Sequence, residues 1–193
     1  MIGLIFWKQE YKFTLPTPKP LNYVEVAQGD SVNIPYSSGN LTYFHFYNYD
    51  CPCSRFNVKE FQSLVNKYDD KVTFYAVLET SGASSDDVDE FLQKYDLGIN
   101  VIKDNDGKVA ASLGVYSTPQ AVLVKDQKIY YKGNYNKARF CLSKNTKFAA
   151  QALEALVKGE PVPDFPFVAQ IAYGCELPAN TSNDKNLFSF LDI

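Results

Sequence analysis

The chain has 193 residues, which is enough for one well-buried domain and short for two ordinary ones. With 46% hydrophobic and 15% aromatic residues it can build a packed core, which excludes the disordered and low-complexity classes. Its 19 basic and 22 acidic residues give a net charge of -3, so the sequence lacks the excess of basic residues that is typical of nucleic-acid-binding proteins. Four cysteines are the unusual feature, and they direct the search for function to thiol chemistry.

The N-terminal arm, residues 1–21, begins with the apolar run Met1–Trp7. This run is too short to cross a bilayer, which takes about 20 residues, and it lacks the basic region and cleavage site of a complete signal peptide. Two interpretations stay open: an ordinary first strand or apolar arm of the domain, or the remnant of an anchor helix that tethers the protein to a membrane. The Pro-rich stretch Leu15–Pro20 is predicted to be extended.

Residues 22–160 are predicted to form an α/β domain, because strand and helix patterns alternate along them. Strands are expected at 41–48, 72–78, 100–103, 120–125 and 128–131, the last two joined by a tight turn at Asp126-Gln127. Helices are expected at 52–68, from Ser84 to Tyr95, at 108–113 and at 145–158. Residues 161–193 form a Pro-rich and then polar C-terminal extension that we expect to pack on the domain.

Cys51 stands where the first buried strand meets the following helix, in the run Cys51-Pro52-Cys53-Ser54-Arg55. Proline suits the first helical position, which makes Cys51 the expected N-cap residue. The positive end of the helix dipole favours a thiolate there, so Cys51 is the candidate nucleophile. Arg55 is expected to support the thiolate, and the neighbouring Asp50 opposes it.

A disulfide between Cys51 and Cys53 requires non-helical backbone, because residues two apart on a helix point to different sides. A second feature lies downstream, where Thr118-Pro119 comes directly before a buried strand. Proline cannot donate to a strand ladder, so this pair marks an edge or a special turn, for which a cis peptide is a candidate.

Three stretches carry a resemblance to a known family: Phe44–Cys51, Val101–Ala110 and Gly114–Ala121. On these, residues 40 to 135 resemble the redoxin branch of the thioredoxin fold, the TlpA/ResA-like and AhpC/TSA-type proteins. The resemblance implies a thioredoxin-like central mixed sheet flanked by helices. It also implies a redox Cys-x-x-Cys in the first stretch, and in the last a cis-proline whose preceding backbone, here Thr118, pairs with a substrate chain.

The chain departs from that pattern at one position. If Cys51 matches the family's nucleophile, Ser54 stands in the place of the resolving cysteine, and the site reads Cys-Pro-Cys-Ser. The second redox thiol is therefore expected to be Cys53, with Cys141, Cys175 or a partner's thiol as alternatives. Asn48 stands where peroxiredoxins place a threonine, which disfavours peroxidase chemistry.

Cys141 and Cys175 lie outside the standard fold. We expect them to form a structural disulfide that fastens the C-terminal extension, and the alternative is that one of them resolves Cys51 or Cys53. An even number of cysteines suits an oxidising compartment. His45, among aromatic residues of the first strand, is interpreted as a core residue rather than a base for the cysteine site.

Together these features predict a thiol-disulfide oxidoreductase that acts on protein thiols or disulfides, with Cys51 and Cys53 as catalytic residues. Ser54, Arg55, Thr118 and Pro119 would support the site, with no cofactor or metal. A periplasmic or cell-envelope location is expected, with a cytoplasmic one as the alternative. Two other functions stay open: a copper(I)-handling module, since Cys-Pro-Cys offers two soft ligands, and a redox-inactive thioredoxin-like binding module.

Overall fold

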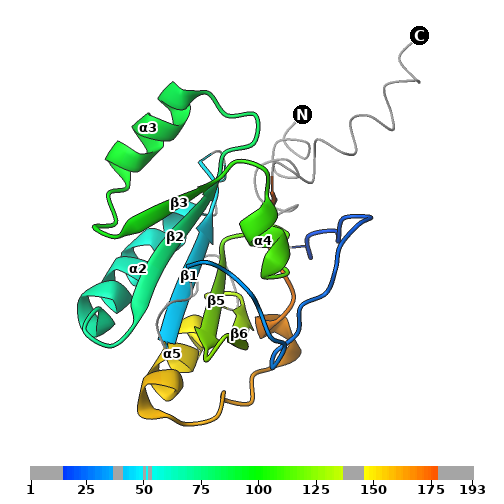
Figure 1. Cartoon of the computed structure of the whole chain (residues 1–193), viewed down its shortest axis with the longest axis vertical. Helices are drawn as coiled ribbons and strands as arrows, with labels where there is room; N and C mark the ends of the chain where they lie inside the picture. Colours follow the sequence, from blue (N-terminus) through cyan, green and yellow to red (C-terminus); the bar gives the residue numbers. More distant parts are fainter. Residues whose placement is uncertain (1–14, 37–40, 50, 52–53, 137–145, 178–193) are drawn as a thin grey trace, which may run out of the picture.

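The computed structural model describes residues 15–36, 41–49, 51, 54–136 and 146–177. Its centre is a five-stranded mixed sheet in the order β3-β2-β1-β5-β6 (Figure 1). β1, β2 and β3 are parallel, whereas β5 runs antiparallel to both β1 and β6. The strands of this sheet are β1 Leu41–Tyr47, β2 Thr73–Glu79, β3 Asn100–Asp104, β5 Gln120–Lys125 and β6 Lys128–Gly133. This arrangement confirms the predicted α/β class with parallel crossovers and an antiparallel hairpin edge.

β1 is the central strand and is buried on both faces. Alternate side chains point to opposite sides of a strand, so Tyr43 and Tyr47 enter one apolar cluster while Phe44 and Phe46 enter the other. This two-sided burial explains why its sequence is aromatic throughout, and it holds the carboxyl end of β1 firmly in the middle of the sheet.

Helices cover both faces of the sheet. α2, α3 and α5 supply the first cluster, and α4 packs on the other face together with residues of the segment 26–36. The helices are α2 Ser54–Tyr68, α3 Ser85–Lys94, α4 Lys108–Ser112 and α5 Phe148–Lys158. Figure 1 shows α4 and the N-terminal segment on one side of the sheet. None of the helices in the described ranges is long and apolar enough to cross a membrane.

Interactions between residues close in sequence determine where several of these elements begin or turn. Ser84 caps α3 by accepting a hydrogen bond from the Asp87 amide at 3.2 Å. Asp126 and Gln127 both have positive φ, as the two-residue hairpin turn between β5 and β6 requires. The buried Asp104 carboxylate accepts from the amides of Val109 and Ala110 at 3.1 and 2.9 Å, and so anchors the start of α4.

One helix start differs from the prediction, since α5 begins at Phe148 rather than at 145. α2 is described from Ser54, and its predicted start at Pro52 lies outside the described residues. The α5 start follows burial, since Phe148 and Ala149 are the first residues of that segment to enter the core. The N-terminal run Met1–Trp7 and the tail beyond 177 also lie outside the described residues.

Three short segments of the described chain lie beside the sheet. β4 (Ser117–Thr118) and β7 (Cys175–Glu176) pair antiparallel as a separate two-stranded sheet. A 3-10 turn, η3 (Phe167–Ala169), precedes β7 and packs against the first apolar cluster through the fully buried Ala169. The described part of the C-terminal extension therefore returns to the domain, and its strand ends beside the carboxyl end of β1.

Candidate active site

Cys51 lies in a turn that joins β1 to α2. Its backbone N–H donates to the carbonyl of Asn48 at 3.2 Å, and its carbonyl accepts from the N–H of Ser54 at 3.1 Å. The Asn48 N–H in turn donates to the Ser54 hydroxyl at 3.0 Å. These bonds hold Cys51 three residues before Ser54, where the 15-residue helix α2 begins, and the amino end of a helix carries partial positive charge that favours a thiolate.

Cys51 is disulfide-bonded to Cys175, 124 residues further along the chain, with 5.9 Å between the two Cα atoms. The expected structural pair of Cys141 and Cys175 is therefore wrong for this state, because Cys175 is already bonded. The physical reason is that the extension folds back onto the end of β1 and brings Cys175 to Cys51. Cys141 and Cys53 both lie outside the described residues.

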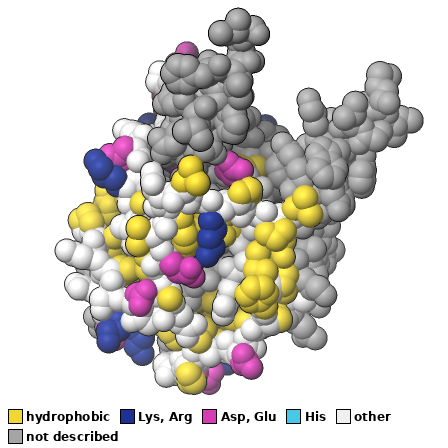
Figure 2. Space-filling view, turned by 90° about the vertical axis from the view of Figure 1, so that its right-hand side faces the viewer, with side chains coloured by type: hydrophobic (Ala, Val, Ile, Leu, Met, Phe, Trp, Pro, Cys, Tyr) yellow, Lys and Arg dark blue, Asp and Glu magenta, His cyan; other side chains and the backbone are white. Residues whose placement is uncertain are grey.

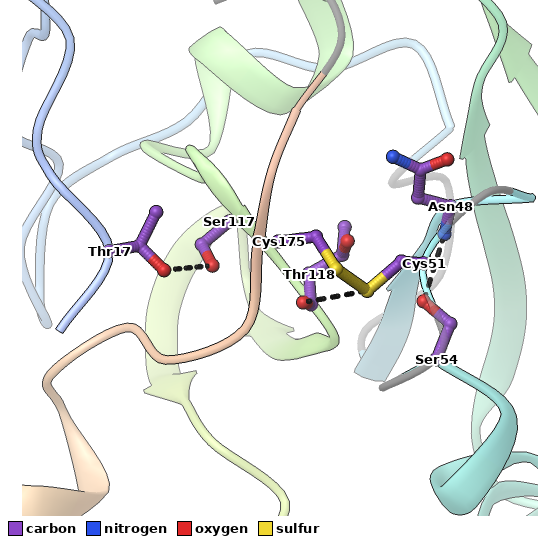
Figure 3. The surroundings of a disulfide bond; sticks show 7 residues. All are labelled: Thr17, Asn48, Cys51, Ser54, Ser117, Thr118 and Cys175. Carbon is purple, nitrogen blue, oxygen red and sulfur yellow. Dashed lines mark hydrogen bonds between the residues drawn. A yellow bond between two sulfur atoms is a disulfide. The ribbon is translucent and has the colours of Figure 1, made fainter. Parts of the chain in front are cut away.

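Backbone pairing holds Cys175 beside the Thr118-Pro119 bond, which is cis. In the β4–β7 register Thr118 lies opposite Cys175 and Ser117 opposite Glu176. The pairing continues one residue further, where the Leu177 N–H donates to the Tyr116 carbonyl at 3.3 Å. Figure 3 shows the disulfide next to the Thr118 carbonyl oxygen, which is 3.7 Å from Cys51 Sγ.

The contact between Cys51 Sγ and the Thr118 oxygen changes its nature with redox state. A disulfide sulfur has no proton to donate, so in the oxidised protein this is a van der Waals contact. In the reduced protein a Cys51 thiol could donate to the same oxygen, which would favour the protonated form. The carbonyl and the amino end of α2 therefore act on the thiol in opposite directions.

Gly174 allows β7 to approach β4 this closely. Its φ is +133°, and a Cβ built there would lie 2.1 Å from the Thr118 carbonyl oxygen. Any other residue would have to move the backbone, because the obstructing atom is itself backbone. The residue before Cys175 is thus fitted to the cis-proline turn by having no side chain.

The N-terminal segment lies against β4 and the residues that lead into β7. Pro16 forms a bridge with Tyr173, and the Thr17 N–H donates to the Ala172 carbonyl at 2.8 Å. The buried Thr17 and Ser117 hydroxyls are 2.7 Å apart, as Figure 3 shows. Figure 2 shows that the described surface of this side of the molecule mixes apolar side chains with charges of both signs.

The structure thus brings together four residues that the sequence names, namely Cys51, Ser54, Thr118 and Pro119, while the side chain of Arg55 lies outside what it describes. Sequence reasoning missed Thr17, Ser117 and Gly174. For Gly174 a signal exists, since it directly precedes a cysteine; for Thr17 and Ser117 only the folded chain reveals the contact.

His45 is a core residue, as interpreted from the sequence. It is fully buried, its ring stacks on Phe61 with 4.3 Å between centroids, and Nδ1 is hydrogen-bonded to the Tyr135 hydroxyl. Burial lowers the pKa of His45 to about 3, so the ring is neutral at physiological pH. Within the described ranges, no group of three or more His, Cys, Asp or Glu side chains could hold a metal ion.

Comparison with known proteins places this site in a family. The model of a domain of unknown function, DUF6436, matches residues 24–176. The chain belongs to the DUF6436 family. The DUF6436 match includes both Cys51 and Cys175 and ends one residue after the latter. A search of curated proteins finds no match.

Solved structures establish the fold of this DUF6436 chain. A hypothetical protein of Sinorhizobium meliloti 1021 is 18% identical with a TM-score of 0.66, over 80% of this chain and 95% of its own. An uncharacterized conserved protein from Geobacillus kaustophilus is 20% identical with a TM-score of 0.64, over 84% and 97%. The solution structure of a thioredoxin-like protein in the oxidized form is 12% identical with a TM-score of 0.52, over 75% and 97%. The fold is therefore thioredoxin-like, as the sequence resemblance implies.

Proposed function

We propose that the chain is a thiol-disulfide oxidoreductase in which Cys51 and Cys175 form a reversible redox pair. The observation that carries the proposal is the disulfide itself, which joins a cysteine at the amino end of α2 to one on a strand beside the cis-proline turn. In this reading Cys51 is the nucleophile, and Cys175 takes the resolving part that the sequence assigns to Cys53.

Cys51 and Cys175 differ in exposure, and this difference favours one of the two sulfurs as the point of attack in thiol-disulfide exchange. Cys51 is only 1% exposed, whereas Cys175 is half-buried, so an incoming thiolate reaches the Cys175 sulfur more readily. When that thiolate attacks Cys175 Sγ, the bond to Cys51 breaks and Cys51 leaves with the electron pair. The dipole of α2 stabilises the departing Cys51 thiolate, and a lower-pKa thiol leaves faster.

The cycle closes by thiol-disulfide exchange alone. A dithiol reduces the Cys51–Cys175 bond in two exchanges and is itself oxidised to a disulfide. The Cys51 thiolate then attacks a protein disulfide, forming a mixed disulfide and releasing one substrate thiolate. Attack by Cys175 on Cys51 Sγ restores the internal bond and releases the second substrate thiol. Every step is reversible, so the partner's potential sets the direction.

A stable internal disulfide suits an oxidising compartment, and we place the protein outside the cytoplasm, at the periplasm or cell envelope. Thr118 and Pro119 would hold the backbone of a protein substrate beside Cys51, and Arg55 would tune its charge. The exchange itself needs only thiols and disulfides of protein partners, without a cofactor.

The test is the reduction of insulin by dithiothreitol, measured with wild-type protein and three matched variants. We expect wild type to accelerate the reaction and Cys51→Ser to abolish the acceleration. Reduced Cys175→Ser, mixed with insulin after the dithiothreitol is removed, should form a mixed disulfide with insulin chains, visible as a mass increase. In the dithiothreitol assay Cys141→Ser should behave as wild type. Full activity of Cys51→Ser would refute the proposal. Stoichiometric binding of Cu(I) that depends on Cys51, without exchange activity, would instead favour the copper alternative.

A further inference from the structure

β7 occupies a backbone edge that a foreign chain could use. The edge is offered by β4, and its position next to Cys51 means that whatever pairs with it is presented to the nucleophile. The recognition uses main-chain atoms, because Thr118 opposes Cys175 and the Leu177 N–H donates to the Tyr116 carbonyl. Main-chain pairing accepts any extended peptide, as in the strand-addition mode of recognition.

One position of the bound strand is sterically selected. The residue before the bonded cysteine, Gly174, has φ +133° and leaves no room for a Cβ against the Thr118 oxygen. The strand position beside β4 therefore fits an extended chain in which glycine directly precedes the cysteine.

The C-terminal extension is held at two separate places. Its base is fixed by Asn134, whose N–H donates to the Ala169 carbonyl and whose side-chain amide donates to the carbonyls of Val168 and Ile171. Residues 173–177 depend on other contacts: the disulfide, the pairing with β4 and Tyr116, the bridge to Pro16 and the buried Leu177. Breaking the disulfide removes the covalent cross-link that holds residues 173–177, while the hydrogen bonds of Asn134 keep the preceding part of the extension in place.

From these features we infer that residues 173–177 are a built-in occupant of the substrate strand position, released when Cys51–Cys175 is reduced. The vacated edge then takes an extended segment of a protein substrate, antiparallel to Ser117–Thr118, with glycine before the reacting cysteine. This inference rests on the proposed function and adds its substrate class. Because β7 and substrate compete for one edge, the return of Cys175 both supplies the resolving thiolate and displaces the product.

The test uses two blocked heptapeptides and a protein whose only thiol is Cys51, made by replacing Cys53, Cys141 and Cys175 with serine. One peptide has the sequence of residues 171–177, and the other differs by alanine in place of Gly174; in both, the cysteine is activated with thionitrobenzoate. The Cys51 thiolate attacks the peptide sulfur, a new disulfide forms, and thionitrobenzoate leaves with the electron pair of the broken S–S bond. The coloured product gives the rate.

We expect the glycine peptide to react about ten-fold faster than the alanine peptide or more, since a side chain in this backbone region is strained and meets a backbone oxygen. Free glutathione should react equally with both peptides, which controls for intrinsic reactivity. Equal rates with Cys51 would overturn the inference and leave the proposed function standing. If Cys51 reacts with neither peptide and also fails to react with dithiobis(nitrobenzoate), the proposed function is refuted as well.

A second measurement follows the release of β7 directly. Amide hydrogen exchange of wild type should show protection of residues 116–118 and 173–177 falling together on reduction, by about ten-fold or more, while protection around Ala169 persists. Unchanged protection would mean that β7 stays in place and would overturn the inference. A covalent dimer through exchanged Cys175 strands as the sole product of reoxidation would also overturn it, by making a second copy the occupant.

Discussion

Reduction of the Cys51–Cys175 bond should lower the unfolding free energy by an amount set by the loop that it closes. The bond joins residues 124 apart in sequence. In the chain-entropy model a loop of that length costs the unfolded chain about 16 cal/mol/K, or about 5 kcal/mol at 25 °C. Native disulfides typically contribute about 2–5 kcal/mol, so the upper part of that range is expected here.

Urea unfolding followed by circular dichroism measures this difference, with and without a phosphine reductant. The oxidised protein should unfold at higher urea, and its m-value should be smaller because a cross-linked unfolded chain exposes less surface. The control is the double variant Cys51→Ser, Cys175→Ser, whose curve should not respond to the reductant. Coincident curves for oxidised and reduced wild type, or an equal response of the double variant, would refute the reasoning.

Two further predictions concern the residues around the site. Because the pKa of buried His45 is about 3 against 6.5 in the unfolded chain, unfolding takes up a proton between these values. Stability should therefore fall as pH drops from about 6.5 toward 3, by about 1.4 kcal/mol per pH unit, and His45→Phe should remove that part of the slope; an unchanged slope contradicts it. Ser54→Ala should cost about 1–3 kcal/mol in urea unfolding by removing the buried hydroxyl that accepts the hydrogen bond from the Asn48 N–H. The control Ser112→Ala, at an exposed hydroxyl bonded to a helix carbonyl, should cost less than about 0.5 kcal/mol, and equal losses would count against the Ser54 role.

The elements that the sequence predicts well are those with a local cause. The aromatic run of β1 is recognisable because a central strand is apolar on both faces. The cap at Ser84 and the turn at Asp126-Gln127 depend on residues a few positions apart. The turn before α2 is also local, so the sequence places Cys51 correctly at the junction of strand and helix.

The pairing of Cys51 with Cys175 could not be predicted in the same way. Four cysteines allow three complete pairings, and spacing along the chain does not choose among them. The pairing is decided by the return of the C-terminal extension to β4. A two-residue strand such as Cys175–Glu176 is too short to show a periodic pattern from which that return could be predicted. Gly174 is the one local signal, and its meaning depends on the Thr118 oxygen that it faces in the fold.

The central claim is that Cys51 and Cys175 form the redox pair, and disulfide mapping by mass spectrometry tests it most directly. Protein oxidised under mild conditions would be alkylated without reduction, digested and searched for cross-linked peptides, with Cys51→Ser as the matched control. We predict a Cys51–Cys175 link that disappears on reduction, returns on reoxidation and is lost in the variant. A Cys51–Cys53 or a Cys141–Cys175 link in its place would contradict the account.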